Sequence, residues 1–174
     1  MIQRKTQTAE YWQDFTLTPS DSAFLHTLLL DAERPITTLA LAEAVVAERC
    51  RREEVELRAE LSRGVMYQPK KRFKTGEKVI FPALEFRLGE IIDVRPGQNP
   101  EYGEFEVISV DFGSDRRQRS FAAGLTAPHK LNVEAVDLLI SGDVQPPTVL
   151  LETIAAHVPA MLKLQLIQQP DFAT

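Results

Sequence analysis

Apolar side chains spaced three and four residues apart predict a helix near the start of the chain. Ser20 or Asp21 can cap this helix, which we place over residues 21–31. Leu25 and Leu29 lie one turn apart on its apolar stripe. The polar residues on the other side of the helix predict that one face packs against a core and the other meets water.

A proline break separates the first helix from a second one. Pro35 cannot continue a helix, and Thr37 or Thr38 can cap the next helix, which runs to about Arg49. Its apolar residues also recur at helical spacing. They are Leu39, Ala42 and Val46, beside Leu41 and Val45.

Residues 51–62 carry two conflicting patterns. Positions 55–61 alternate between apolar and polar, which is typical of a half-buried strand. The same residues are strong helix formers, however, and Glu54 and Arg58 form a well-oriented i, i+4 pair. We therefore predict a third helix, ended by Gly64.

After Gly64 the pattern changes to short runs rich in Val, Ile and Phe, separated by Gly and Pro turns. Such runs are typical of strands. The predicted strands are 78–81, 89–95, 103–112 and a shorter one at 117–121. Four or five short strands in so few residues cannot form a sandwich, so we predict a small closed or half-open antiparallel barrel. Its expected core residues are Val79, Phe81, Ile91, Val107, Val110 and Phe121.

The chain turns helical again from Leu131. Asn132 can cap a helix over 133–140, and a second apolar stretch covers residues 148–168. Pro159 should break or kink that stretch.

The apolar residues of 148–168 cover more than one helical face, so they must be buried. We expect burial against a second copy of the chain in a symmetric homodimer, with an intramolecular core contact as the alternative. The residues expected at this interface are Leu151, Ile154, Val158, Met161 and Leu162.

Composition and charge narrow the class of protein. A chain of 174 residues with 44% hydrophobic and 26% charged residues is ordinary globular protein and not a disordered or collagen-like one. The single cysteine, Cys50, excludes an internal disulfide, and no apolar run is long enough for a signal or a membrane span. We therefore expect a cytoplasmic protein. A net charge of −5 argues against a histone-like coating protein, although residues 67–132 are net positive.

A run of cations with interleaved aromatic residues begins that positive region. The cations are Lys70, Lys71, Arg72 and Lys74, and the aromatic residues are Tyr67 and Phe73. Phosphate binding needs several cations close to one backbone, and an aromatic ring beside them can stack on a base. The alternative interpretation is a solvated linker between two domains.

A second group of cations would extend this patch if the barrel folds it alongside. It consists of Arg116, Arg117 and Arg119. At the tip of a hairpin the same residues can instead keep an edge strand from pairing with another chain.

The predicted third helix is a poor candidate for reading DNA sequence. Its arginines are matched by glutamates, which repel phosphate, whereas a helix in the major groove shows a cationic or amide-rich face.

Motifs for catalysis or metal binding are missing from the sequence. His26, His129 and His157 lie in separate segments, none at the spacing of metal ligands. The arginines around Cys50 could lower its pKa, but a small residue packed at a helix end is the expected role. We expect no enzyme and no cofactor.

Two stretches resemble known families. The segment Ala32-Glu-Arg-Pro-Ile-Thr-Thr-Leu-Ala-Leu-Ala-Glu-Ala-Val resembles the opening of winged helix-turn-helix domains, within residues 20–82. The runs Gly76-Glu-Lys-Val-Ile-Phe, Leu88-Gly-Glu-Ile-Ile-Asp-Val, Glu106-Val-Ile-Ser-Val-Asp-Phe and Arg119-Ser-Phe resemble the strands of small Tudor-like or KOW-like (SH3-like) barrels, such as those of CarD-type regulators and bacterial DNA helicases. The long connector 95–103 departs from that pattern. The resemblance implies contact with nucleic acid or RNA polymerase.

These observations predict an α+β protein in four parts. They are an N-terminal tail (1–19), a helix-turn-helix-like domain (20–66), a small barrel (67–130) and a C-terminal helical segment (131–174). The expected function is non-enzymatic binding of DNA or RNA, or an association with transcription, through the basic patch. The alternatives are a protein-interaction or assembly domain that uses the C-terminal helices, and an enzyme without a recognisable motif. The apolar helix close to the end of the chain also suggests the N-terminal part of a longer protein.

Overall fold

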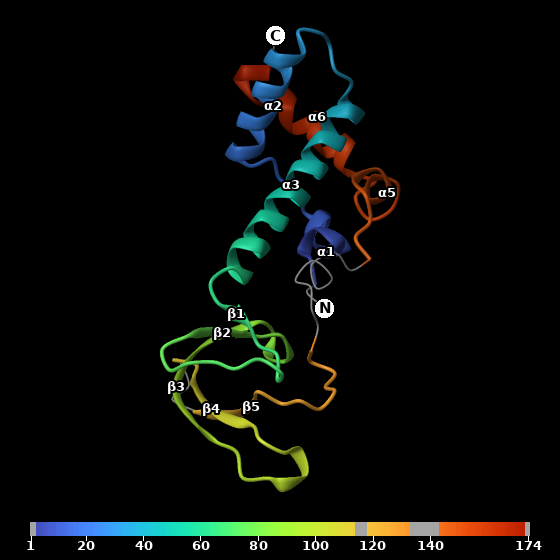
Figure 1. The fold of residues 1–174 in the computed structure, drawn as a ribbon. Helices are drawn as coiled ribbons and strands as arrows, with labels where there is room; N and C mark the ends of the chain where they lie inside the picture. Colours follow the sequence, from blue (N-terminus) through green and yellow to red (C-terminus); the bar gives the residue numbers. More distant parts are fainter. Residues whose placement is uncertain (1–2, 114–117, 133–142, 173–174) are drawn as a thin grey trace. The chain divides into compact units, whose positions relative to one another are not determined.

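The computed structural model describes residues 3–113, 118–132 and 143–172, which form two compact units (Figure 1). The helical unit contains the described residues among 3–56 and 141–174, and the sheet unit contains those among 57–140. Helices at both ends of the chain and a sheet between them in sequence confirm the α+β fold class. The helix predicted over 133–140 lies outside the described residues.

The helical unit is built from short helices that precede and follow the long helix α3. In chain order the helices of the described chain outside the sheet region are η1 (Lys5–Gln7), α1 (Ala9–Gln13), α2 (Pro19–Ala32), α3 (Thr38–Leu61), α5 (Pro147–Glu152), α6 (Val158–Gln168) and η4 (Pro170–Phe172). Among the described residues, none of the helices is long and apolar enough to cross a membrane.

Helix α2 confirms the first predicted helix and begins two residues earlier. Its N-cap is Thr18 and not Ser20 or Asp21. The Thr18 hydroxyl accepts a hydrogen bond from the Asp21 backbone N–H, and the Asp21 carboxylate accepts one from the Thr18 N–H. This reciprocal capping box satisfies two backbone donors that have no partner inside the helix.

Helix α3 corrects the prediction of two separate helices, because it continues through Arg49 without a break. Neither Gly nor Pro occurs between Thr38 and Leu61. Ion pairs from Glu48 to Arg51 and Arg52, at 2.7 and 2.9 Å, also cross the position of the expected break. Spacings of three and four residues favour the helical backbone at that point. The predicted third helix is therefore the second half of α3.

The C-terminal segment completes the core of the helical unit. Leu150, Val158 and Leu162 are fully buried in the same cluster as Trp12 and Leu25. Three further residues that we expected at a dimer interface pack against this cluster and are partly buried. They are Leu151, Ile154 and Met161. The intramolecular alternative is therefore the one that the structure shows, and Val158 and Leu162 are too buried to form an exposed interface.

The break in the C-terminal stretch is confirmed, and it comes earlier than Pro159. Helix α5 ends at Glu152, and Pro159 lies in the first turn of α6, where its missing N–H costs no hydrogen bond. Gln165 of α6 then ties the N-terminal chain in place. Its Oε1 accepts a hydrogen bond from the Leu17 N–H at 2.6 Å, and its Nε2 donates to the Phe15 carbonyl at 2.9 Å.

A buried carboxylate links α2 to α3. The side chain of Asp21 is 1% exposed and accepts hydrogen bonds from the guanidinium groups of Arg49 and Arg52. The Arg49 guanidinium also lies over the ring of Phe15, 4.7 Å from its centroid. Burial raises the pKa of Asp21, but the hydrogen bonds from Arg49 and Thr18 outweigh that effect and lower the pKa below its ordinary value.

The sheet of the described residues has five strands in the order β1-β2-β3-β4-β5. They are β1 (Val65–Met66), β2 (Lys78–Phe81), β3 (Arg87–Pro96), β4 (Glu106–Asp111) and β5 (Arg119–Ala123). Strand β1 pairs with β2 in parallel, and the other neighbours are antiparallel. The four predicted strands are confirmed, while β1 was not predicted because two residues carry no detectable alternation.

The core of the sheet unit follows the alternation of β4. Ile108 and Val110 are fully buried together with Val79, Phe81 and Ile91. Successive residues of a strand point to opposite faces, so Val107 cannot share a face with Val110. The prediction of Val107 as a core residue was therefore wrong. Phe121 packs against the core and is partly buried.

The two edges of the sheet meet through the chain that follows each edge strand. The Gly124 N–H donates to the Lys71 carbonyl at 2.8 Å, and the Leu125 N–H donates to the Pro69 carbonyl at 2.9 Å. The Tyr67 hydroxyl donates to the Ala122 carbonyl at 2.6 Å. These contacts join the chain at the two edges of the sheet. The prediction that the sheet is wholly antiparallel is wrong, because β1 pairs with β2 in parallel.

Replacing Asp21 by Asn should destabilise the helical unit. The variant removes the buried charge that Arg49 and Arg52 share, while Arg52 keeps its ion pair with Glu48. We expect a loss of about 3 kcal/mol in the free energy of unfolding at neutral pH, measured by urea denaturation. Because the pKa of Asp21 is lowered in the folded state, its stabilisation is present above the ordinary Asp pKa and is lost as the pH falls through the folded pKa. The difference between variant and parent should therefore shrink in acid. The exposed Asp31, also on α2, supplies the control Asp31→Asn, which should cost little; equal losses for both variants would contradict the role of Asp21.

Candidate nucleic-acid interface

The predicted basic cluster forms an ordered turn between β1 and β2. Lys70, Lys71 and Arg72 are exposed and lie between two buried aromatic residues, Tyr67 and Phe73, each 5% exposed. The buried rings anchor both ends of the turn in the core of the sheet unit. The sequence Tyr-x-x-cation-cation-cation-Phe therefore places three neighbouring cations on the surface while it fixes the chain on either side.

Backbone hydrogen bonds hold the turn between these anchors. The Lys71 N–H donates to the Gln68 carbonyl at 2.9 Å, and the Lys71 carbonyl accepts from Gly124. The Lys70 N–H donates to Oδ1 of Asn132 at 3.2 Å. A backbone paired in this way belongs to the sheet unit, so the alternative of a solvated linker between two domains is wrong.

The two aromatic residues of the cluster do not face solvent. The Tyr67 ring stacks on Phe81 and Phe73, with centroid distances of 4.7 and 6.0 Å. Burial raises the pKa of Tyr67 to about 12, so its hydroxyl is protonated at neutral pH and donates to Ala122. The expectation that Tyr67 and Phe73 stack on a base is therefore wrong, because both rings are already packed in the core.

Carboxylates border the cluster on two sides. The Arg72 Nη1 atom lies 3.8 Å from Oε1 of Glu106, with the side chains 70% and 30% exposed. Lys74 is exposed just beyond Phe73, and its backbone N–H donates to the Glu77 carboxylate at 3.0 Å. Ion pairs of this exposure contribute little free energy, so Arg72 can leave Glu106 for a stronger anion.

Arg119 lies away from the cluster. It begins β5, whereas the Arg72 side chain packs beside Gly124, just after β5 ends. That separation is roughly 17 Å along an extended chain at ~3.4 Å per residue. Arg119 instead lines a second hollow together with Arg87 and Glu85. Arg116 and Arg117 lie outside the described residues.

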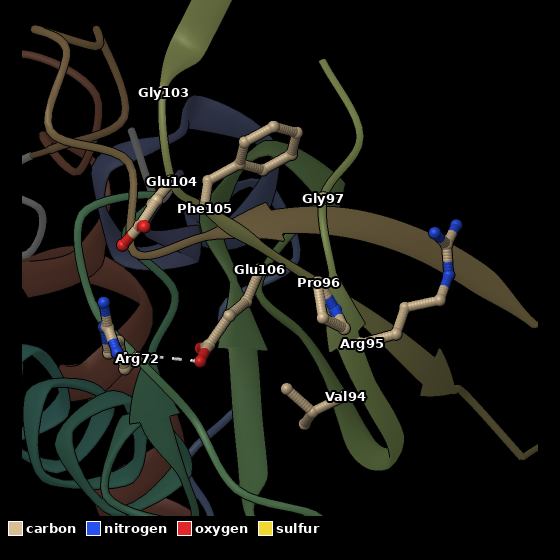
Figure 2. A pocket seen from close by; sticks show the side chains of 9 residues that line it. All are labelled: Arg72, Val94, Arg95, Pro96, Gly97, Gly103, Glu104, Phe105 and Glu106. Carbon is tan, nitrogen blue, oxygen red and sulfur yellow. Dashed lines mark ion pairs between the residues drawn. The ribbon is translucent and has the colours of Figure 1, made fainter. Parts of the chain in front are cut away.

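A hollow of about 400 Å³ opens beside the basic turn, and Figure 2 shows the side chains that line it. Arg72 belongs to both the turn and the hollow, and Glu106 extends toward it from β4. The remaining lining residues come from the ends of β3 and β4 and from their connection. They are Val94, Arg95, Pro96, Gly97, Gly103, Glu104 and Phe105.

Phe105 shapes one side of this hollow. A Cβ atom on Gly97 would lie 2.3 Å from the Phe105 ring, so the ring packs directly over the glycine backbone. The Gly97 N–H donates to the Phe105 carbonyl at 2.8 Å and fixes the two chains at this point. Only glycine allows this approach of ring to backbone.

The sequence pattern does not reveal the hollow, although Arg72 belongs to the predicted basic cluster. The register of β3 and β4 pairs Pro96 with Glu106, and the curl of the sheet then brings Arg72 to the same place. Glu106 begins β4 a few residues after the long connector 95–103. A charged residue at that position was the signal in the sequence that could have pointed to this site.

Two observations concern the metal and thiol chemistry considered from the sequence. No group of three or more His, Cys, Asp or Glu side chains in these parts of the chain could hold a metal ion. Burial raises the pKa of the Cys50 thiol, which opposes the effect that the neighbouring arginines suggested. Cys50 packs against the helical core, as expected for a small residue.

Replacing Tyr67 by Phe should lower stability and leave nucleic-acid affinity unchanged. The variant keeps the stacked ring but removes the hydrogen bond to Ala122, so we expect a loss of about 1 kcal/mol in urea denaturation. Tyr67→Ala should cost about 3 kcal/mol or more, because it leaves a cavity in the core. A Tyr67→Phe variant with parental stability and weakened nucleic-acid binding would contradict the buried role.

Comparison of the chain with known proteins identifies no relative. No family model, no curated protein and no solved structure matches the chain. The resemblances to winged helix-turn-helix domains and to Tudor-like or KOW-like barrels stay predictions from the sequence. The function of the sheet unit is therefore argued from its own residues.

Proposed function

We propose that the sheet unit binds nucleic acid without catalysing a reaction, through phosphate contacts of the basic turn. The observation that carries the proposal is the placement of Lys70, Lys71 and Arg72 on one surface turn whose backbone is already fixed. Lys74 supplies a fourth cation beyond Phe73. A fixed turn loses little conformational entropy on binding, so more of the electrostatic attraction appears as affinity.

The net negative charge of the chain limits the affinity of this binding. At −5 overall, the protein repels a polyanion at a distance, and the neighbouring cations of the basic turn attract it at close range. The expected affinity is therefore modest, strongly dependent on salt and weakly dependent on sequence.

Helix α3 does not support reading of duplex sequence in the major groove. Its arginines near the middle of the helix are engaged by carboxylates, with Arg51 and Arg52 on Glu48 and Arg49 on Asp21. These pairs support a structural role for the arginines, so the proposal assigns binding to the sheet unit alone. We also propose a cytoplasmic location for the protein, because the lone Cys50 is suited to a reducing compartment.

The salt dependence of binding tests the proposal. If about four phosphates are contacted, the logarithm of the binding constant should fall with the logarithm of salt concentration with a slope of about −3.6 on duplex DNA and about −2.8 on single strands. Replacing the four cations of the turn by Ala should remove most of that slope, measured by fluorescence anisotropy. The cations are Lys70, Lys71, Arg72 and Lys74.

A matched variant separates the turn from net charge. Replacing four exposed lysines elsewhere by Ala changes the net charge equally and should keep most of the slope. These lysines are Lys5, Lys78, Lys130 and Lys163. Equal loss in both variants, or parental binding by the first, would contradict the proposal.

A second candidate function rests on an apolar stripe of α6. Leu164 and Ile167 are 60% and 61% exposed and lie three residues apart, on the same side of the helix. Exposed apolar side chains grouped in this way favour a protein-interaction surface. We propose this surface, with a homodimer as its simplest form, as the alternative to nucleic-acid binding.

Light scattering tests whether Leu164 and Ile167 join two copies of the chain or are simply exposed to solvent. Leu164→Asp should keep the parental melting temperature, because the side chain is exposed, and should halve the mass if the stripe joins two copies. Leu162→Asp should instead unfold the helical unit, because it places a charge in the core. A parent that is monomeric at high concentration would contradict the homodimer.

A further inference from the structure

We propose that the hollow beside the basic turn receives an unpaired nucleic-acid base that carries an exocyclic amino group. This inference rests on the proposed function and adds to it the kind of strand and the kind of base. The hollow and the turn share Arg72 (Figure 2), so a strand whose phosphates contact the turn places a neighbouring base within reach of the hollow.

The lining of the hollow is unsuited to a phosphate group. The carboxylates of Glu104 and Glu106 offset the charges of Arg72 and Arg95 in the lining, so the hollow has no excess of positive charge to hold a phosphate. Val94, Pro96 and Phe105 also belong to the lining, and their apolar surface suits the flat face of a base. A volume of about 400 Å³ leaves room for one base and ordered water.

The pair Arg72 and Glu106 selects among bases by its hydrogen-bonding pattern. Its nearest nitrogen and oxygen atoms are 3.8 Å apart, so a donor group and an acceptor group stand side by side. Cytosine presents the complementary edge, since its amino group can donate to the Glu106 carboxylate while its ring nitrogen and carbonyl accept from Arg72. Thymine and uracil carry an N–H group between two carbonyls, so they can donate to the Glu106 carboxylate but then offer Arg72 one adjacent acceptor where cytosine offers two.

The ligand is a single strand because that edge of a base is paired in a duplex. Proteins that read sequence in single strands contact the Watson–Crick edges of splayed bases and stack on their faces. The hollow offers both kinds of contact next to cations. A duplex can still contact the basic turn, but it cannot fill the hollow.

Binding of oligo(dC) and oligo(dT) of equal length tests the inference. Both are pyrimidine strands with the same phosphate charge, so phosphate contacts alone give equal affinities. We expect the parent protein to bind oligo(dC) at least about fivefold more tightly at neutral pH and constant salt, as measured by fluorescence anisotropy.

Two methionine variants compare the hollow with its surroundings. Glu106→Met removes the acceptor and keeps the length of the side chain, and it should bring the ratio of the two affinities to about one. Glu101→Met removes the same charge from the exposed connection between β3 and β4, outside the lining of the hollow, and should keep the ratio. Loss of negative charge alone strengthens binding of both strands equally, so the ratio isolates the contact with the base.

A third variant preserves the test if Glu106→Met does not fold, as judged by thermal denaturation. Arg72→Lys keeps the cation, and therefore the salt slope, but lacks the planar fork that donates to two acceptors. It should also reduce the preference for oligo(dC).

The outcomes separate the inference from the proposed function. Equal affinities in the parent, or a preference that persists in Glu106→Met and Arg72→Lys, would overturn the base hollow while salt-dependent binding still supports the basic turn. Absence of binding to either strand at low salt would overturn both.

Discussion

The sheet unit depends on the contact between the turn that follows β1 and the chain that leaves β5. Strand β1 has only two residues, and by itself so short an edge strand holds a sheet weakly. The hydrogen bonds of Gly124 to Lys71 and of Tyr67 to Ala122 attach the turn to the opposite edge. They bury Tyr67 beneath the turn and satisfy backbone groups that the sheet edges would expose. The same contact gives the basic residues a fixed position.

The two units use their arginines in different ways. In the helical unit, Arg49 and Arg52 bind the buried Asp21 and join α2 to α3, where their charge is neutralised within the fold. In the sheet unit, Arg72 is 70% exposed and has a carboxylate at 3.8 Å, which allows it to exchange partners. The arginines that α3 presents to Asp21 and Glu48 are thus paired within the fold, whereas Arg72 lies on the surface in a weak ion pair.

The connection between β3 and β4 gives this site a second component. Its close packing of Phe105 on Gly97 positions the rim of the hollow, and Glu106 extends from β4 toward the turn. A cationic turn alone holds any phosphate chain, whereas a neighbouring donor and acceptor can distinguish one base from another. In the two proposals Arg72 takes part in both phosphate and base binding, whereas Glu106 affects only the preference for a base, so that preference can be changed at Glu106 alone.

Local pattern determined most of the elements of this protein, and long-range contacts determined the site. The apolar stripe of α2, which contains Leu25, is a pattern among residues close in sequence. The Val- and Ile-rich runs of the sheet are local in the same way. Helix α2 and four strands could therefore be predicted. The continuity of α3 at Arg49 could also have been predicted from Glu48 and its partners on the next turn. The burial of Tyr67 and the meeting of Arg72 with Glu106 depend instead on residues far apart in sequence, which only the curl of the sheet brings together. Periodicity records which face of an element is apolar, but it carries no information about which distant element covers that face.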